Sequence, residues 1–351
     1  MDFGWIDDSN PVAVWWMLLA AVATLNVALW LVLYRLLRKR VFVHRRLLDL
    51  QYLLPLGAAY VVGCAFRSFI PRADVQRMVL FDHWISSVAV GRTVATVAEV
   101  CFVIQWVLLL RYFGRITKSD TVLNISRIIV PLILVAETCS WYAVVTTSYL
   151  GNTVENSIWA VAFTLIAVAL LRLMSDFHRP VRIAMGVVIT GILFYVGFLV
   201  LVDVPMYFAR WEADMSGGKA LFGIVAGIHD AATRWTVTHR IADWSEEIPW
   251  MSLYFSAAVW SSLLLCGFAM IADRMPRCAE SDIRDQGFAF SASSLALRRA
   301  LLGNASTIGC SSIAGICASC RCGSISISCR TRPEDRISCS VRYISMNSIS
   351  S

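Results

Sequence analysis

Seven apolar runs dominate this sequence, and each is long enough to cross a lipid bilayer as a helix. A hydrocarbon core about 30 Å thick requires about 20 residues of α-helix. The runs cover residues 12–37, 47–69, 84–110, 127–148, 155–174, 181–203 and 251–272. With 58% hydrophobic and only 16% charged residues, the chain has too little polar surface for a soluble domain of its length. The sequence therefore predicts an all-α, polytopic transmembrane helical bundle with about seven spans.

The basic residues predict how this bundle is oriented. Arg and Lys are retained on the cytoplasmic side of short loops. They gather in the turns after the first, third and fifth runs and are sparse in the turns between. We therefore expect the N-terminus outside and the C-terminus in the cytoplasm, with the lipid bilayer as the main partner. Because the formal net charge of +7 comes largely from arginines beside apolar runs, we expect no nucleic-acid partner.

The chain divides into three regions. Residues 1–11 form a short outer N-terminus, 12–272 the seven-helix transmembrane domain and 273–351 a Ser- and Cys-rich cytoplasmic tail. The outer loop at 204–248 is too long for a simple turn. Its apolar stretch 220–228 is too short to span, which predicts an interfacial helix packed on the mouth of the bundle. The tail keeps no helical or strand period, so we expect it to be mostly disordered.

Ionisable groups inside the apolar runs indicate where the functional region lies. Such groups cost several kcal/mol in a bilayer unless they are paired or face water. Counted at about 1.5 Å per residue, Arg92 lies about 12 Å deep, Glu137 about 16 Å and Glu99 about 22 Å. Arg92 and Glu99 share one helical face, and Glu137 and Trp141 lie on a polar stripe of the next run. We expect these four residues to form a polar centre that is reached from outside.

A second charged layer is predicted nearer the outer surface. Arg67, Glu155 and Asp203 lie at the outer ends of three different runs. Because carboxylates outnumber arginines across both layers, at least one carboxylate should be unpaired, protonated or bound to an entering ligand. The alternative is that all these charges are salt bridges that fix the register of the helices.

The third run also carries a face of small residues. Ser87, Gly91 and Ala95 are spaced by four, which lets a neighbouring backbone approach closely. We expect tight helix packing on this face. The combination of a small face with a charged face indicates that the third run is the core of the bundle.

No cofactor and no metal site is predicted. His229, Asp230 and His239 in the outer loop match no compact metal site, and solvated loop residues are the better interpretation. The tail cysteines include one Cys-x-x-Cys pair, whereas a zinc site needs two such pairs or a pair with histidines. Cys278, just past the basic end of the last run, is a possible palmitoylation site.

Known catalytic classes of multi-span proteins lack their residues here, so no enzyme activity is predicted. The last run has no lysine for a retinal Schiff base, and His83, the histidine nearest a run, lies at the rim, which argues against a zinc hydrolase. Resemblance to G-protein-coupled receptors stops at topology. The remaining hypotheses are transport or sensing of a small molecule or ion through the polar centre, and a non-catalytic membrane scaffold or assembly factor.

Overall fold

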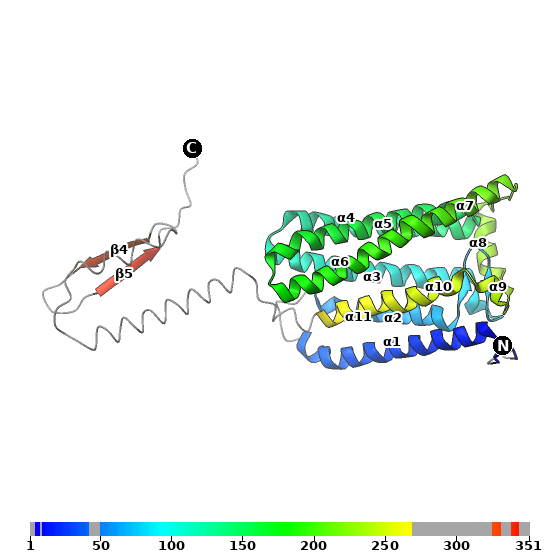
Figure 1. The fold of residues 1–351 in the computed structure, drawn as a ribbon, viewed down its shortest axis with the longest axis horizontal. Coiled ribbons are helices and arrows are strands. Elements are labelled where there is room, and N and C mark those ends of the chain that lie inside the picture. Colours follow the sequence, from blue (N-terminus) through cyan, green and yellow to red (C-terminus); the bar gives the residue numbers. More distant parts are fainter. Residues whose placement is uncertain (1–3, 8, 42–49, 269–324, 331–337, 344–351) are drawn as a thin grey trace. The chain divides into compact units, whose positions relative to one another are not determined.

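Seven helical segments of the protein are long and apolar enough to cross a membrane, which confirms the predicted all-α polytopic bundle (Figure 1). The structure is a computed structural model that describes residues 4–7, 9–41, 50–268, 325–330 and 338–343. The chain forms two compact units, Met1–Ile283 and Arg284–Ser351, and the bundle belongs to the first. The first five spans are formed by α1 (Pro11–Val41), α2 (Leu53–Phe69), α3 (Val88–Thr117), α4 (Asp120–Thr146) and α5 (Tyr149–Leu173).

Each of the last two spans combines two α-helices through a π-helical turn. In the sixth span, α6 (Arg179–Phe198) continues through Leu199–Asp203 into α7 (Val204–Ser216). In the seventh, α10 (Glu247–Leu253) continues through Tyr254–Ala258 into α11 (Val259–Phe268). A wider π turn just before Pro205 accommodates a residue that cannot donate a backbone hydrogen bond. The predicted outer loop at 204–248 therefore begins later than expected, because its first residues extend the sixth helix.

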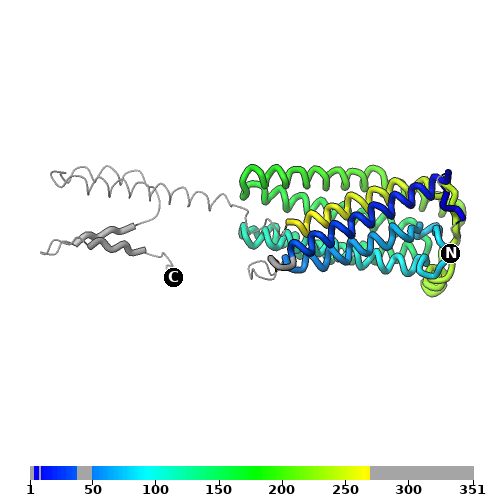
Figure 2. Tube along the Cα trace, turned by 90° about the horizontal axis from the view of Figure 1, so that it is seen from below, coloured from blue at the N-terminus to red at the C-terminus, as the bar shows by residue number. Residues whose placement is uncertain are grey.

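The third span is the centre of the bundle, as its sequence suggested. α3 contacts α2, α4, α5, α8 and α11. α1 packs against α2 and α11 at the edge of the bundle, and Figure 2 shows it in blue in front of the other helices. The apolar window of α3 is 56% buried within the protein, against 17% for α1. Close approach of α4 and α5 depends on Gly151, since a Cβ there would lie 2.5 Å from the carbonyl oxygen of Cys139.

One end of the bundle is covered by a folded cap, which comprises residues 70–87 and 217–246. It contains a three-stranded sheet of β1 (Arg72–Ala73), β2 (Met78–Val79) and β3 (Thr236–Val237). β1 and β2 are antiparallel, and β2 and β3 are parallel. Two helices, α8 (Ile224–Thr233) and α9 (Ile241–Trp244), complete the cap.

The predicted interfacial helix corresponds to α8. It packs on α3 and α4, and it leaves Ile224 and Val225 exposed. The N-terminal segment also rests on the cap, where Trp5 stacks on His239 with ring centroids 4.2 Å apart. His239 Nε2 lies 2.8 Å from the carbonyl oxygen of Leu80. The interpretation of the histidines and Asp230 as solvated loop residues is therefore wrong for His239 and for Asp230, which is buried.

The tail contains two strands that the sequence did not predict. β4 (Ile325–Arg330) and β5 (Ser338–Tyr343) pair antiparallel. The prediction of disorder for most of the tail, and of lipidation at Cys278, falls on residues outside the described ranges.

Candidate functional site

The polar centre is organised around one guanidinium nitrogen of Arg92. Its Nη2 lies 2.7 Å from Glu137 Oε2, 2.8 Å from Glu99 Oε2 and 3.6 Å from Glu155 Oε1. Arg92 and Glu99 come from the same face of α3, two turns apart, while Glu137 comes from α4 and Glu155 from α5. All four residues are buried. The structure thus brings Arg92, Glu99 and Glu137 together as expected, and adds Glu155.

Hydroxyl and indole groups fix the carboxylate on α4. Thr96 Oγ1 donates to Glu137 Oε2 at 2.7 Å and accepts from Trp141 Nε1 at 3.1 Å. Thr96 lies on α3, one turn from Arg92, so both donors approach the same carboxylate oxygen. Trp141, predicted to belong to the centre, therefore acts on Glu137 through Thr96.

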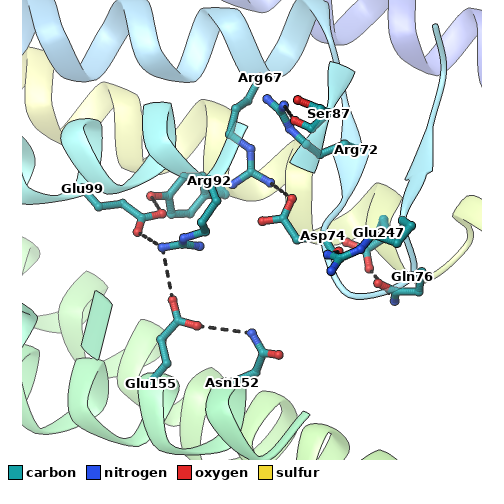
Figure 3. A network of polar contacts seen from close by, with 12 residues as sticks. Arg67, Arg72, Asp74, Gln76, Ser87, Arg92, Glu99, Asn152, Glu155 and Glu247 are labelled. Carbon is teal, nitrogen blue, oxygen red and sulfur yellow. Dashed lines mark hydrogen bonds and ion pairs between the residues drawn. The ribbon is translucent and has the colours of Figure 1, made fainter. Parts of the chain in front are cut away.

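The other two carboxylates have further polar partners. Tyr254 Oη donates to Glu99 Oε1 at 3.0 Å from the π-helical turn of the last span. Asn152 Nδ2 donates to Glu155 Oε2 at 3.2 Å, and Figure 3 shows both groups on α5, facing Arg92. The centre therefore joins α3, α4, α5 and the last span.

Negative charge is in excess in this network. Three buried carboxylates surround one guanidinium group, and each isolated charge is costly in a low-dielectric interior. Within the described residues, Glu137 Oε1 and Arg92 Nε are buried without a hydrogen-bond partner. The network is thus neither electrically balanced nor saturated in hydrogen bonds, and it has capacity for a proton or another cation.

The same carboxylates are the candidate metal ligands of the described residues. One oxygen each from Glu99, Glu137 and Glu155 lies within 4.8 Å of the other two. Arg92 Nη2 already occupies the point on which they converge. A metal ion could be held there after the guanidinium group moves away.

The predicted outer layer does not form as a unit. Arg67 Nη2 pairs with Asp74 Oδ1 at 3.7 Å, and Glu155 belongs to the polar centre. Asp203 is buried on the π-helical turn of the sixth span, and it does not line the cavity that the other two share. Glu155 lies deeper than expected because α5 begins at Tyr149, which places Glu155 nearly two turns inside the helix.

A cavity of about 100 Å³ adjoins the polar centre on the side of the cap. Figure 3 shows Arg67 beside the centre, paired with Asp74 of the cap. Gln76 of the cap donates through Nε2 to Glu247 Oε1 of α10 at 3.3 Å. Aromatic side chains, among them Trp250 and Tyr254, complete the wall. Its charged lining consists of Arg67, Arg72, Asp74, Arg92, Glu99, Glu155 and Glu247.

An aromatic layer closes the opposite side of the centre. Phe102 and Trp106 lie one and two turns beyond Glu99 on α3, and both are buried. Phe102 stacks on Tyr60 with centroids 4.5 Å apart, and Phe163 lies 6.4 Å from both Phe102 and Trp106. This layer separates the polar centre from the basic end of the bundle.

Sequence reasoning missed two arginines of the cap. Arg72 and Arg77 follow the second apolar run, in one of the turns where basic residues are sparse, yet the structure buries Arg72 completely and Arg77 almost completely. The signal that could have found them is their position, because an arginine on the side where arginines are depleted calls for a local reason. The small face of α3 also has a different use, since a Cβ at Gly91 would lie 1.6 Å from Arg72 Cζ.

The chemistry of the site therefore comes from its own geometry: buried acids around one arginine, a cavity on one side and an aromatic layer on the other. No protein-family model, no curated protein and no solved structure matches this chain.

Proposed function

We propose that this multi-pass membrane protein binds a small polar molecule or ion at the polar centre, and that it serves transport or ligand sensing. The observation that carries the proposal is the surplus of buried carboxylates around Arg92 in the wall of a cavity. Ionisable groups in this position are a functional feature of membrane proteins more often than a stabilising one. Binding of a ligand would change which carboxylate Arg92 holds.

The two versions of the function differ at the aromatic layer. Sensing requires the ligand to bind in the cavity and its effect to travel along α3 to the basic end. Transport requires the layer around Phe102, Trp106 and Phe163 to part, since these buried rings pack against one another beyond Glu99. A carboxylate, Glu137 or Glu99, would then change its proton or partner as the substrate passes.

A scaffold role is the second candidate, and the short ion pairs of Arg92 with Glu99 and Glu137 favour it. The two candidates differ in the protonation of the centre. Carbodiimides modify protonated carboxylic acids, so the purified protein at neutral pH should give an adduct on Glu99, Glu137 or Glu155 by peptide mass spectrometry. A centre that serves only as a scaffold, with its charges fixed in salt bridges, should give none. Glu246, an exposed carboxylate paired with Arg210, is the internal control.

Flux measurements test the function directly. Proteoliposomes that contain a pH-sensitive dye should show faster proton movement with the wild-type protein than empty vesicles under an imposed gradient. Glu137→Gln should return the rate to that of empty vesicles, because the titratable group is removed, whereas the matched change Glu246→Gln should have no effect. Equal rates for the wild type and Glu137→Gln would exclude a proton-coupled transporter that uses this residue.

The orientation of the bundle is part of the proposal. The arginine alternation supports a cap that faces the outside, where it would admit ligand to the cavity. Tags at the N-terminus and in the cap should be reached from outside in intact cells, and a tag at Ser351 should not. Protection of the cap tag in a protein that is present at the cell surface would reverse the orientation.

A further inference from the structure

Arg72 is a buried cation with unused donors. It is fully buried at the start of β1, where its Nη1 donates to the carbonyl oxygen of Ser87 at 3.0 Å. Its Nε and Nη2 are buried and have no hydrogen-bond partner among the described residues. The Phe66 ring lies against the guanidinium group, with its centroid 5.3 Å from Cζ. A guanidinium group in this state has lost its water and gained only one hydrogen bond in return.

The protein has made room for this group. Gly91 on α3 provides the recess, because any Cβ at that position would overlap the guanidinium group. Burial, and next the charge of Arg67, lower the pKa of Arg72 to about 9. Arg72 therefore keeps its proton at neutral pH and stands beside a second cation. Asp74 lies nearby, but its Oδ1 is 3.7 Å from Arg67 Nη2 and it does not satisfy the donors of Arg72.

The two free donors form one edge of the guanidinium group. Nε–H and Nη2–H point in parallel, and a carboxylate accepts both of them with its two oxygens. Arg72 lines the cavity next to the polar centre, as do Arg67 and Arg92. An anionic group that enters the cavity would meet three arginines and four carboxyl groups. Arg72 has a complete edge without a partner among the described residues, and this edge is buried, so a ligand would reach it only after the side chains around it shift.

Size limits the ligand to a few heavy atoms. A cavity of about 150 Å³ holds benzene, and this cavity measures about 100 Å³. We propose that the cavity binds a small carboxylate-bearing molecule, with its carboxylate on the free edge of Arg72 and Arg67 beside it. This deepens the proposed function, on which it rests, by naming the ligand class of the same cavity.

The test uses the full chain in detergent or nanodiscs and measures thermal unfolding against ligand concentration at constant ionic strength. The probes are sodium acetate and glycine as carboxylates, methylammonium chloride as a cation and sodium chloride as the reference. Acetate and glycine should raise the unfolding temperature in a saturable way, and methylammonium should not exceed chloride. Equal effects of acetate, glycine and chloride on the wild type would overturn the proposal.

Variants assign the effect to the arginine. Arg72→Lys keeps the charge but removes the two-donor edge, so the apparent affinity for acetate should fall by about tenfold or more. Gly91→Ala keeps Arg72 and closes its recess, and should weaken acetate binding as well. The control is Arg240→Lys, at an arginine whose side chain is 80% exposed, and it should change the affinity less than about twofold. Undiminished acetate binding in either folded variant would refute the role of Arg72. If neither variant folds, the comparison of acetate and glycine with chloride on the wild-type protein decides.

The outcomes separate this inference from the proposed function. A carbodiimide adduct on the polar centre, or a flux that depends on Glu137, together with acetate binding that ignores Arg72, would sink the carboxylate site alone. Absence of both the adduct and the flux would remove proton-coupled transport through the polar centre, while acetate binding that depends on Arg72 would still be measurable.

Discussion

Arg77 in the cap and Arg92 in the bundle are both buried arginines, but their surroundings differ in one decisive way. Arg77 uses every edge of its guanidinium group. Nε donates to Asp230 Oδ2 at 3.0 Å, Nη1 to the carbonyl oxygen of Asp74 at 2.7 Å and Nη2 to the carbonyl oxygen of Val144 at 2.7 Å. Its contacts thus join the turn between β1 and β2, α8 and the end of α4.

Arg92 concentrates its contacts on one nitrogen instead. Three carboxylates lie around Nη2, while Nε and Glu137 Oε1 have no partner among the described residues. Asp230 meets two arginines, Arg77 and Arg234, so the cap has no surplus of acid. A saturated, compensated network holds a structure in one state, whereas an unsaturated one with excess charge can respond to a proton or a ligand.

The backbone of the cap supports the same distinction. Gly227 of α8 lies so close to the end of α4 that a Cβ there would come within 2.0 Å of the carbonyl oxygen of Val145. The Phe222 amide also donates to the carbonyl oxygen of Thr146 at 3.3 Å. The cap is therefore docked on α4 by backbone contacts and by Arg77, and we expect it to keep one position on the bundle.

The largest stability effect should come from Arg77→Leu. The change leaves Asp230 buried with only Arg234 and leaves two carbonyl oxygens without their donor. Breaking a buried ion pair in this way costs about 3–5 kcal/mol, and thermal or denaturant unfolding in detergent would measure it. Arg240→Leu, which removes an exposed arginine paired with Asp243, should cost less than about 1 kcal/mol. Equal losses of unfolding free energy for the two variants would show that the contacts of Arg77 do not stabilise the cap on the bundle.

We expect Arg92→Leu to lower the free energy of unfolding less than Arg77→Leu does, although Arg92 has more ionic partners. The three carboxyl groups, of which Glu99 and Glu155 line the cavity, can take up protons, and neutral acids remove most of the penalty of isolated charges. We expect about 1–3 kcal/mol, together with complete loss of proton flux. Adding Glu137→Leu should restore stability but not flux, as a double-mutant cycle would show. A larger loss of unfolding free energy for Arg92→Leu than for Arg77→Leu would show that the polar centre contributes more to stability than the cap network.

The polar centre could be predicted because helical geometry alone relates its residues. Arg92 and Glu99 are seven residues apart on one helix, and counting depth from the span ends made Glu137 level with Arg92. Glu155 was placed too near the surface, since its depth depends on where α5 begins. That point is set by the tight turn at Thr147, whose φ of 58° is left-handed.

The contacts of the cap, unlike those of the polar centre, could not be predicted from the sequence. Arg72 and Arg77 lie in a short connection that reads as a solvated turn. The burial of Arg77 depends on a segment about 150 residues later. No periodicity links the two segments, because the β2–β3 pairing spans only two residues on each strand. Pairings this short and distant leave no trace in local hydrophobic pattern.

Acid should weaken the cap more than it weakens the centre. Burial raises the pKa of Asp230, but hydrogen bonds from Arg234 and Arg77 outweigh it and hold the pKa below its usual value. The stability from this carboxylate is therefore present above its unfolded pKa of about 3.9 and is lost as pH falls through the lower folded value. The protection of α8 amides from hydrogen exchange, measured relative to the intrinsic exchange rate at each pH, should decrease below that range. Asp230→Asn should remove this pH dependence of the protection. An unchanged pH profile in Asp230→Asn would assign the acid sensitivity to another group.

The smallest stability effect should be that of Glu137→Gln, and it separates the two regions most sharply. The amide oxygen can still accept from Arg92 and Thr96 at the position of Oε2, and the change removes one of the three acidic groups. Lost charge assistance and reduced acid surplus oppose each other, so the unfolding free energy should change by less than about 1 kcal/mol. Proton flux should nevertheless be lost, since Gln cannot exchange a proton, while Glu246→Gln should keep both properties. A destabilisation as large as that of Arg77→Leu, with no effect on flux, would show that the polar centre stabilises the fold as the network of Arg77 does. The surplus of carboxylates would then need a structural explanation.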